Sequence, residues 1–286
     1  MRPDEIIALA AVLARPYRIV PPGVAAGGPA GVFAGRGDGQ SVDFHDYRQY
    51  LPGDDLRRVD WRAYARSGQM QLKLFREEVS PVVELLLDTS GSMGVYPGKA
   101  ETALFLAAFI KNAAVAVEGR PVLCRDGKRF AGGDFEAALA DTSFSGVGDK
   151  HEYPVSGAGG RPLRFHVSDY MFDGGAASFF RRHAAGSLLF CPIMVLSRTE
   201  REPDWRGHCR LFDAEKPEDS LDLTLDESVV SAYRKRLHSH EESIDAEARR
   251  HGGRLVRLDV PDDGMRAEDF RELAARLSEE RLVTAR

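Results

Sequence analysis

After Pro81 the chain alternates between short apolar runs and segments with helical spacing. The runs are of strand length, and the clearest are VVELLL, PLRFHV, LLFCPIMVL and RLVRLDV. Between the first two lies a long helical pattern at 99–117, whose apolar face comprises Ala103, Leu106, Ala107, Ile110, Ala113, Ala114 and Val117. Strands that alternate with helices in this way indicate an α/β fold, with a mostly parallel sheet and helices on both faces.

Weaker patterns complete this part of the chain. Strands are expected at 121–125, 128–131 and 209–215, and helices at 134–141, 227–251 and 267–280. A further helical stretch lies between the runs that end at residue 169 and begin at 188, and Asp173 is a candidate for its N-cap.

The first 80 residues follow a different pattern. A helix at 6–14 should stop at Arg15-Pro16, and the Gly-, Pro- and Ala-rich segment 21–39 should form an arm or loop. We therefore predict two parts, an N-terminal segment at 1–80 and an α/β domain at 81–286.

Two elements are expected at the end of that first segment. Residues 54–68 have the spacing of a short amphipathic helix that ends at Gly68, with Asp54 as a possible cap. Its predicted apolar face comprises Leu56, Val59, Ala63 and Tyr64. The following QMQLKLF alternates polar and apolar residues, as a half-buried strand does.

Composition excludes several classes of function. The 286 residues are 43% hydrophobic, which is enough for a sizeable core, and the net charge of -5 offers no excess of positive charge for nucleic acid. Three cysteines without a CxxC pair support neither a disulfide framework nor a zinc site. The apolar stretch 6–14 is too short to span a bilayer, which takes about 20 residues. We expect a cytoplasmic protein without a membrane segment.

Small oxygen-bearing side chains follow the first apolar run. In DTSGSM, residues 88–93, Asp88, Ser90 and Ser92 recur at every second position. Ligands of parallel α/β sheets bind beyond the carboxyl ends of strands, where this loop is expected. Carboxylate and hydroxyl oxygens suit Mg²⁺ or Mn²⁺, although a serine-rich turn that caps the next helix is an alternative.

Two motifs carry a resemblance to known families. The DTSGSM loop resembles the metal-ion-dependent adhesion site of von Willebrand factor A-type domains. The preceding residues 47–78, YRQYLPGDDLRRVDWRAYARSGQMQLKLFREE, are similar to the signature of the bacterial domain-of-unknown-function fifty-eight (DUF58) family, which carries such a domain. With looser similarity in FHVSDYMFD and in 232–260, the resemblance covers roughly 35–260. It implies a Rossmann-like von Willebrand A-type domain, preceded by a helical and extended N-terminal segment.

The resemblance also implies a set of metal ligands. Ser90 and Ser92 would bind the ion through their hydroxyls, Asp88 would bind it or anchor the other ligands, and Asp169 would complete the carboxylate side. These domains usually add a threonine from a Gly-x-Thr-Asp phrase, which does not occur here. The segment 141–150 offers Thr142, Ser143, Ser145 and Asp149, of which Thr142 is a weak candidate. A metal-free module of the same fold is therefore an alternative.

The function implied is binding rather than catalysis. A carboxylate of a partner protein would fill the open coordination position of the ion. Members of the DUF58 family are typically associated with MoxR-type AAA+ ATPases and are thought to act as adaptors in chaperone-like assembly. The partner expected here is such an ATPase or its client. Relatives often carry two membrane helices ahead of the signature, and their absence from the given sequence favours a cytoplasmic member.

The charged segment before residue 68 has two interpretations. Opposite charges three and four positions apart usually form a solvated face of self-paired side chains. The alternative is a docking surface for the ATPase, with Trp61 as its aromatic anchor among Arg57, Arg58 and Arg62.

A serine hydrolase is the competing class. SGSMG nearly matches the Gly-x-Ser-x-Gly elbow, with Ser92 as the nucleophile, but Ser90 replaces the first glycine. Asp169 and either His208 or His238 follow in triad order.

The segment GVYPGKAE lacks the spacing of a phosphate loop, which argues against an ATP site. We expect no enzymatic activity.

Overall fold

The computed structural model describes residues 1–19, 44–51, 54–75, 80–146, 153–154, 161–171, 176–216 and 218–286. Contacts divide the chain into a larger unit, residues 1–26 with 81–286, and a smaller unit, residues 27–80. The sequence-based division placed the N-terminal helix with the smaller part, whereas in the structure that helix packs on the α/β sheet unit. The predicted boundary between an N-terminal segment at 1–80 and an α/β domain at 81–286 remains a prediction.

The larger unit is built on a six-stranded sheet with the order β11-β8-β7-β4-β5-β6. Its strands are β4 (Val82–Leu87), β5 (Arg120–Arg125), β6 (Lys128–Ala131), β7 (Leu163–Ser168), β8 (Leu189–Ser197) and β11 (Val256–Val260). Every neighbouring pair is parallel except β5 and β6. The predicted mostly parallel sheet is confirmed.

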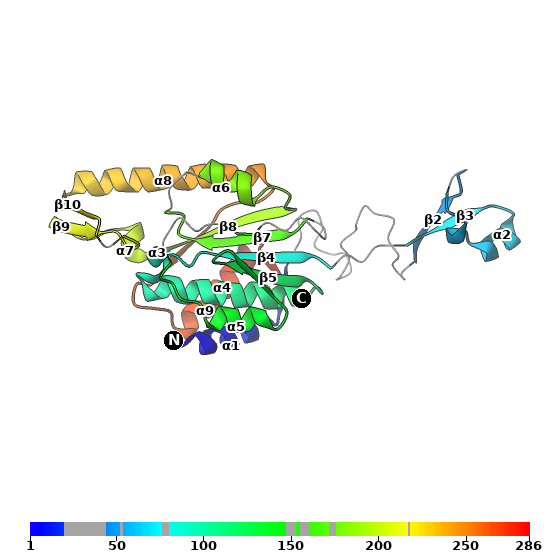
Figure 1. Ribbon diagram of the computed structural model, residues 1–286, viewed down its shortest axis with the longest axis horizontal. Helices are drawn as coiled ribbons and strands as arrows, with labels where there is room; N and C mark the ends of the chain where they lie inside the picture. Colours follow the sequence, from blue (N-terminus) through cyan, green and yellow to red (C-terminus); the bar gives the residue numbers. More distant parts are fainter. Residues whose placement is uncertain are drawn as a thin grey trace. The chain divides into compact units, whose positions relative to one another are not determined.

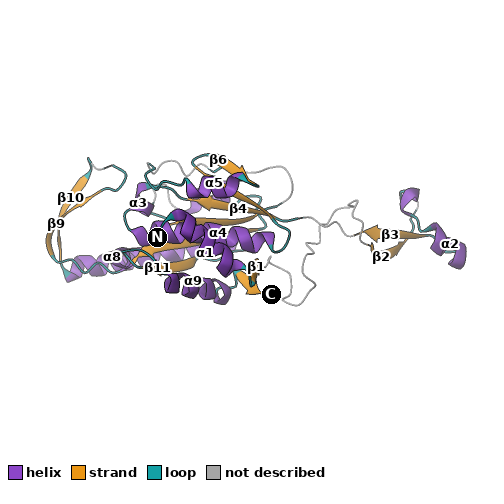
Figure 2. Ribbon diagram, turned by 90° about the horizontal axis from the view of Figure 1, so that it is seen from below, coloured by secondary structure: helices purple, strands orange, loops and turns teal. Residues whose placement is uncertain are grey.

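Helices cover both faces of this sheet, as predicted (Figure 1). The helices on one face are α1 (Pro3–Ala14), α4 (Pro97–Val115), α5 (Asp134–Ala140) and α9 (Ala267–Glu279); those on the other are α6 (Ala176–His183) and α8 (Glu227–Arg250). Figure 2 views the molecule from the side of α1 and α9. Among the described residues, no helix combines the length and apolar character needed to cross a membrane.

The central helix α4 is buried more completely than its amphipathic pattern predicted. All of residues 101–110 are buried, because α1, α5 and α9 cover the side of α4 that faces away from the sheet. Phe105 of α4 stacks on Phe270 of α9 with ring centroids 4.7 Å apart. On the opposite face of the sheet, Phe179 and Phe180 of α6 belong to a second core cluster with Phe190 of β8.

Short elements complete the larger unit. Strand β1 (Tyr17–Ile19) pairs with β12 (Val283–Ala285), which joins the start of the chain to its end. Strands β9 (Gly207–Phe212) and β10 (Ser220–Leu225) form an antiparallel hairpin, of which the sequence predicted only the first strand. Two one-turn helices, α3 (Gly91–Gly94) and α7 (Arg198–Arg201), follow β4 and β8. Asp173, the predicted cap of α6, lies outside the described residues.

The smaller unit corrects one prediction. In place of a single helix at 54–68 there are a 3-10 turn η1 (Leu56–Arg58) and a helix α2 (Trp61–Ser67), separated by Val59, which bridges to Leu72. Asp60, rather than Asp54, caps α2, because its side chain accepts hydrogen bonds from the backbone of Arg62 and Ala63.

The predicted apolar face of that helix does not form either. Leu56 and Tyr64 are 49% and 41% exposed, while Val59 is buried. Gly68 ends α2 with a φ of 68°, as predicted. Strand β3 (Gln71–Phe75) confirms the predicted strand and pairs with β2 (Phe44–Gln49). The Gly- and Pro-rich segment 21–39 lies outside the described residues.

Candidate functional site

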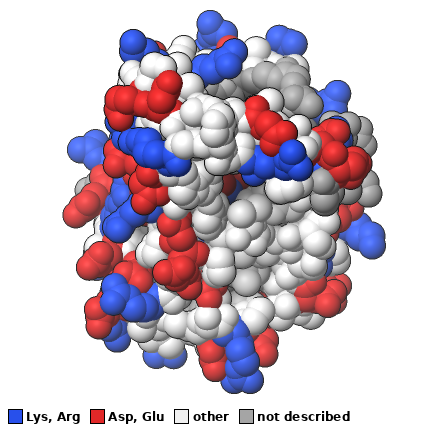
Figure 3. All heavy atoms as spheres, turned by 90° about the vertical axis from the view of Figure 1, so that its left-hand side faces the viewer, with Lys and Arg blue, Asp and Glu red and all other residues white. Residues whose placement is uncertain are grey.

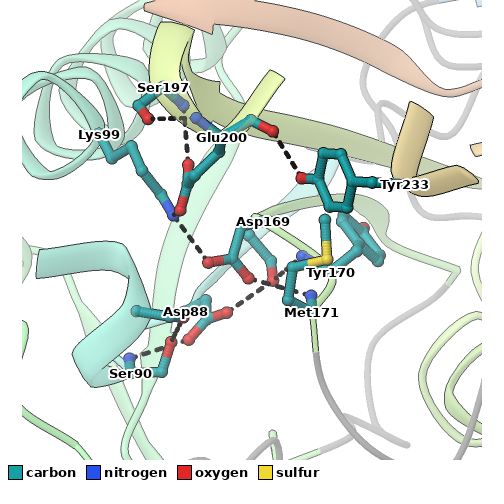
Figure 4. Close-up of polar contacts among 11 residues, drawn as sticks. Asp88, Ser90, Lys99, Asp169, Tyr170, Met171, Ser197, Glu200 and Tyr233 are labelled. Atoms are coloured by element: carbon teal, nitrogen blue, oxygen red, sulfur yellow. Dashed lines mark hydrogen bonds and ion pairs between the residues drawn. The ribbon is translucent and has the colours of Figure 1, made fainter. Parts of the chain in front are cut away.

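Two aspartates meet at the carboxyl edge of the sheet. Asp88 directly follows β4, and Asp169 directly follows β7, its neighbour in the sheet (Figure 4). Both carboxylates are almost fully buried, with exposed fractions of 3% and 2%. The topology therefore brings together two acidic residues that lie far apart in the chain.

Hydrogen bonds to neighbouring described residues hold Asp88. Its Oδ1 accepts from the backbone N–H of Ser90 at 2.9 Å, and its Oδ2 accepts from the hydroxyl of Ser168 at 2.6 Å. Ser168 Oγ also accepts from the backbone N–H of Tyr170 at 2.9 Å. These contacts fix the orientation of the Asp88 carboxylate, as supporting side chains do around a ligand site.

The two loop serines converge beside these carboxylates. Ser90 Oγ and Ser92 Oγ lie 3.0 Å apart, and Ser92 also hydrogen-bonds to Asp169. The loop backbone is pinned by Gly146, whose carbonyl accepts from Gly91 N–H at 2.9 Å and whose N–H donates to the Thr89 carbonyl at 3.0 Å. The serine hydroxyls are thus placed by backbone contacts outside the loop itself.

A buried lysine borders the site. Lys99, in the first turn of α4, is fully buried, and its ammonium lies 2.8 Å from Asp169 Oδ2 and 2.7 Å from Glu200 Oε1 of α7. Burial by itself would lower the pKa of Lys99, but the two carboxylates raise it above its usual value. Burial likewise opposes ionisation of Asp169, yet the nearby Lys99 ammonium holds the pKa of that carboxyl below its usual value.

The charges do not balance among these side chains. Asp88, Asp169 and Glu200 are three carboxylates against the single ammonium of Lys99, which leaves two negative charges in excess when all are ionised. Within the described residues no three His, Cys, Asp or Glu side chains converge as a metal cluster. A cation here would therefore depend on the serine hydroxyls.

The donor set fits such a cation. Adjacent ligands of an octahedral Mg²⁺, each about 2.1 Å from the ion, lie roughly 3.0 Å apart. The separation of Ser90 Oγ and Ser92 Oγ is 3.0 Å. Hard oxygen donors and a local excess of negative charge are what Mg²⁺ or Mn²⁺ requires.

The predicted threonine ligand has a different role in the structure. Thr142 Oγ1 donates to the carbonyl of Ala138 in α5 at 3.0 Å. The backbone of its segment does reach the site, since Gly146 bridges to Ser90. Ser143 and Ser145 share a hydrogen bond of 2.8 Å, while Asp149 lies outside the described residues. The segment is adjacent to the site, but the described bond of Thr142 turns its hydroxyl toward α5.

The residues of the hydrolase alternative are not assembled. His208 hydrogen-bonds to Thr224 at 2.8 Å within the hairpin, and His238 lies 3.3 Å from Glu242 on α8. The hydroxyl of Ser92 has Ser90 and Asp169 as its described partners. Neither histidine takes the position of a general base.

The predicted partner-binding residues lie in the smaller unit. Trp61 is 52% exposed and forms an edge-to-face contact with Tyr64, with ring centroids 6.2 Å apart. Arg57 and Arg62 are also exposed. The side chain of Arg58 lies outside the described part of the chain.

Sequence reasoning missed Ser168, Lys99 and Glu200. Ser168 directly precedes the predicted ligand Asp169, and this position was the available signal. Lys99 stands at the start of an apolar helix, where a charged residue must find a partner if it is buried. Glu200 had no comparable signal, because only the path of the chain after β8 brings it to Lys99.

Three comparisons relate this chain to known proteins. A search of curated proteins finds no match. The conserved hypothetical protein BatB from Bacteroides thetaiotaomicron has a crystal structure that is 16% identical, with a TM-score of 0.35, covering 71% of this chain and 98% of that one. The family described as "Protein of unknown function DUF58" matches residues 46–129, from β2 through the DTSGSM loop to β6.

Proposed function

We propose that this chain is a non-enzymatic protein-interaction module whose DTSGSM loop holds a divalent cation, Mg²⁺ or Mn²⁺, in a domain of von Willebrand factor A type. The observation that supports this most strongly is the pair of serine hydroxyls 3.0 Å apart beside two buried carboxylates. Ser90 and Ser92 would bind the ion directly, with Asp88 and Asp169 completing the acidic side.

The chain's own residues prepare this arrangement. Ser168 and the backbone of Ser90 orient Asp88, while Lys99 holds one oxygen of Asp169 and leaves the other to accept from Met171 N–H at 3.0 Å. A divalent cation bound here would offer a coordination position to a carboxylate of a partner protein. Recognition would thus combine a charged contact with the shape of the surrounding surface.

The proposed partner is a MoxR-type AAA+ ATPase or its client, and the proposed location is the cytoplasm. This step is supported by the DUF58 match and by the resemblance of residues 47–78 to that family's signature. The exposed pair Trp61 and Tyr64 in the smaller unit suits an aromatic anchor for such a partner.

Unfolding in the presence and absence of metal tests the cation site. A cation at about 100 times its dissociation constant should raise the free energy of unfolding by roughly 2.7 kcal/mol. We expect this increase for the wild-type protein in Mg²⁺ relative to EDTA. Asp88→Asn should abolish it, because the substitution keeps the shape of the side chain and removes its charge.

Asp134→Asn is the matched control, since Asp134 is an exposed aspartate at the start of α5 and should leave the metal effect unchanged. An equal Mg²⁺ effect in Asp88→Asn would place the cation elsewhere. If a captured ATPase partner bound as well in EDTA as in Mg²⁺, the metal-assisted mechanism would be wrong.

A metal-free adaptor of the same fold is the second candidate. The observation that favours it is Lys99, whose ammonium already supplies a positive charge to Asp169 and Glu200. The absence of any Mg²⁺ or Mn²⁺ effect on wild-type unfolding would select this candidate.

A further inference from the structure

A cavity of about 760 Å³ lies at the amino-terminal ends of β4 and β5. Val82 begins β4, Arg120 begins β5, and both residues line the cavity. The last two turns of α4 contribute Lys111 and Val115. The DTSGSM loop, by contrast, follows the carboxyl end of β4. Sites for small molecules occupy about 300–1,000 Å³, so this cavity has the size of such a site.

Much of the described lining of the cavity is apolar. Val82, Val122 and Ala131 come from the neighbouring strands β4, β5 and β6. Val115, at the end of α4, is 53% exposed. A ligand with an apolar group would cover these side chains, and removal of their surface from water would stabilise the complex.

The charged side chains of this described lining are all basic. Arg129 lies 2.7 Å from the buried carboxylate of Glu84, and Lys111 lies 2.6 Å from Glu136, whose side chain is 55% exposed. Arg120 is exposed, and the ion pairs of the described part of the chain do not include it. The lining is therefore complementary to a ligand that carries a negative charge.

The end of α4 does not require the Arg120 side chain. Basic side chains near a helix C-terminus often bind its last carbonyl groups. Here the Ala114 carbonyl accepts from the backbone N–H groups of Val117 and Gly119, both at 3.0 Å, and the Val115 carbonyl accepts from a backbone N–H at 3.0 Å. Backbone groups thus cap the helix, which leaves the Arg120 guanidinium for another role.

A lining with charges of one sign differs from the surface elsewhere. At the end of the larger unit that carries α7 and the β9–β10 hairpin, acidic and basic side chains are interspersed (Figure 3). In that hairpin Arg210 pairs with Asp222 at 2.6 Å. Surface charges of that kind neutralise one another, whereas the cavity would take its negative charge from a ligand.

We propose that this cavity binds a small apolar carboxylic acid. The alkyl or aryl group of the ligand contacts Val82, Val115 and Val122, and Arg120 binds the carboxylate with Lys111 beside it. The planar guanidinium of arginine suits a carboxylate, because it can donate two parallel hydrogen bonds. This site is separate from the cation site of the proposed function and does not depend on it.

Calorimetric titration with octanoate, and with octanol as its uncharged analogue, tests the recognition of the carboxylate. Arg120→Gln should weaken octanoate binding about ten-fold, because a hydrogen bond to a charged group contributes roughly that factor. The same substitution should leave octanol binding unchanged. Arg182→Gln is the matched control, since Arg182 is an exposed arginine of α6 outside the described lining, and it should bind octanoate as the wild type does.

A second variant and a second readout locate the ligand. Val115→Glu places a negative charge at an exposed position of the cavity and should abolish octanoate binding. Thermal unfolding without ligand checks that each variant is folded. In NMR spectra of the wild type, octanoate should shift the amide signals of residues 119–122 and leave those of the DTSGSM loop in place.

Equal octanoate binding by the wild type and Arg120→Gln would overturn the proposed role of Arg120 and with it the proposal. Unchanged binding in Val115→Glu would place the ligand elsewhere and overturn the proposal as well. The same conclusion follows if octanoate does not bind the wild type, or if it shifts only the signals of residues 88–93.

Discussion

Strands β4 and β7 carry two buried charged clusters that differ in their charge balance. The interior cluster joins Glu84 of β4 to Arg164 of β7 at 2.6 Å and to Arg129 of β6 at 2.7 Å. The edge cluster comprises Asp88, Asp169, Lys99 and Glu200, beyond the ends of the same two strands. In the first, one carboxylate faces two guanidinium groups; in the second, three carboxylates face one ammonium.

Under the proposed function, this difference separates a structural role from a binding role. Arg164 also donates to the backbone carbonyls of His183 at 2.7 Å and Ala185 at 2.9 Å, so its charge is used within the fold. A buried group of charges that retains excess negative charge is costly unless a cation or donor offsets it. We therefore infer that the interior cluster serves stability, and that the edge cluster is where an external ligand would bind.

The largest effect is expected from Arg164→Met. Removal of this guanidinium leaves Glu84 buried with only Arg129, and the loss of one partner from a buried ion pair costs about 3–5 kcal/mol. Urea denaturation should show this loss equally with Mg²⁺ and with EDTA. Arg129→Met is the matched control, since Arg129 binds the same carboxylate but is 31% exposed, and its effect should be smaller. If Mg²⁺ reversed the loss of stability in Arg164→Met, the purely structural role of the interior cluster would be wrong.

With metal present, Lys99→Met should lower the free energy of unfolding by less than Arg164→Met does. In EDTA the loss should approach about 3 kcal/mol, because Asp169 remains buried without its partner. Mg²⁺ should recover part of that loss and should stabilise the variant more than the wild type, since three carboxylates remain.

The control for this experiment is Lys111→Met on the same helix. Lys111 forms a more exposed ion pair with Glu136, for which a change of at most about 1 kcal/mol is expected. Equal Mg²⁺ stabilisation of Lys99→Met and the wild type would show that the edge cluster does not bind the cation.

The smallest effect concerns thiol reactivity. Burial raises the pKa of Cys124, which lies near Arg129 and Glu84 of the interior cluster, to about 12, and burial raises the pKa of Cys191 to about 12 as well. At pH 8 both should resist a thiol-labelling reagent in the native protein, because the thiolate is the reactive form.

Cys209, in the separate β9–β10 hairpin, is partly exposed and should react. Native Cys209→Ser should then show no labelling, and all three thiols should react in urea. Rapid labelling of Cys124 in the native protein would show that solvent reaches the interior cluster, which would contradict its role as a buried structural cluster.

Much of the architecture was predictable from local pattern. Apolar runs and helical periodicity located β4, β7, β8 and α4, because burial on both faces of a parallel sheet demands such runs. The strands β1 and β12 were missed because three residues give no usable period. The six-residue strands β2 and β10 were also missed, although SLDLTL in β10 alternates polar and apolar residues. The apolar spacing at 54–68 predicted one helix. The structure has two elements there because Asp60 caps α2, and apolar spacing does not reveal a cap.

For the candidate site, the sequence by itself determined the local members. Spacing in DTSGSM was enough to single out Asp88, Ser90 and Ser92, since residues in one tight loop at a strand end must lie together. Only the tertiary structure decided which distant groups join them: Lys99, Ser168 and Glu200. Their approach depends on strand order, on the entry of α4 and on the path of the chain after β8, which are set by packing over the whole domain rather than by neighbouring residues.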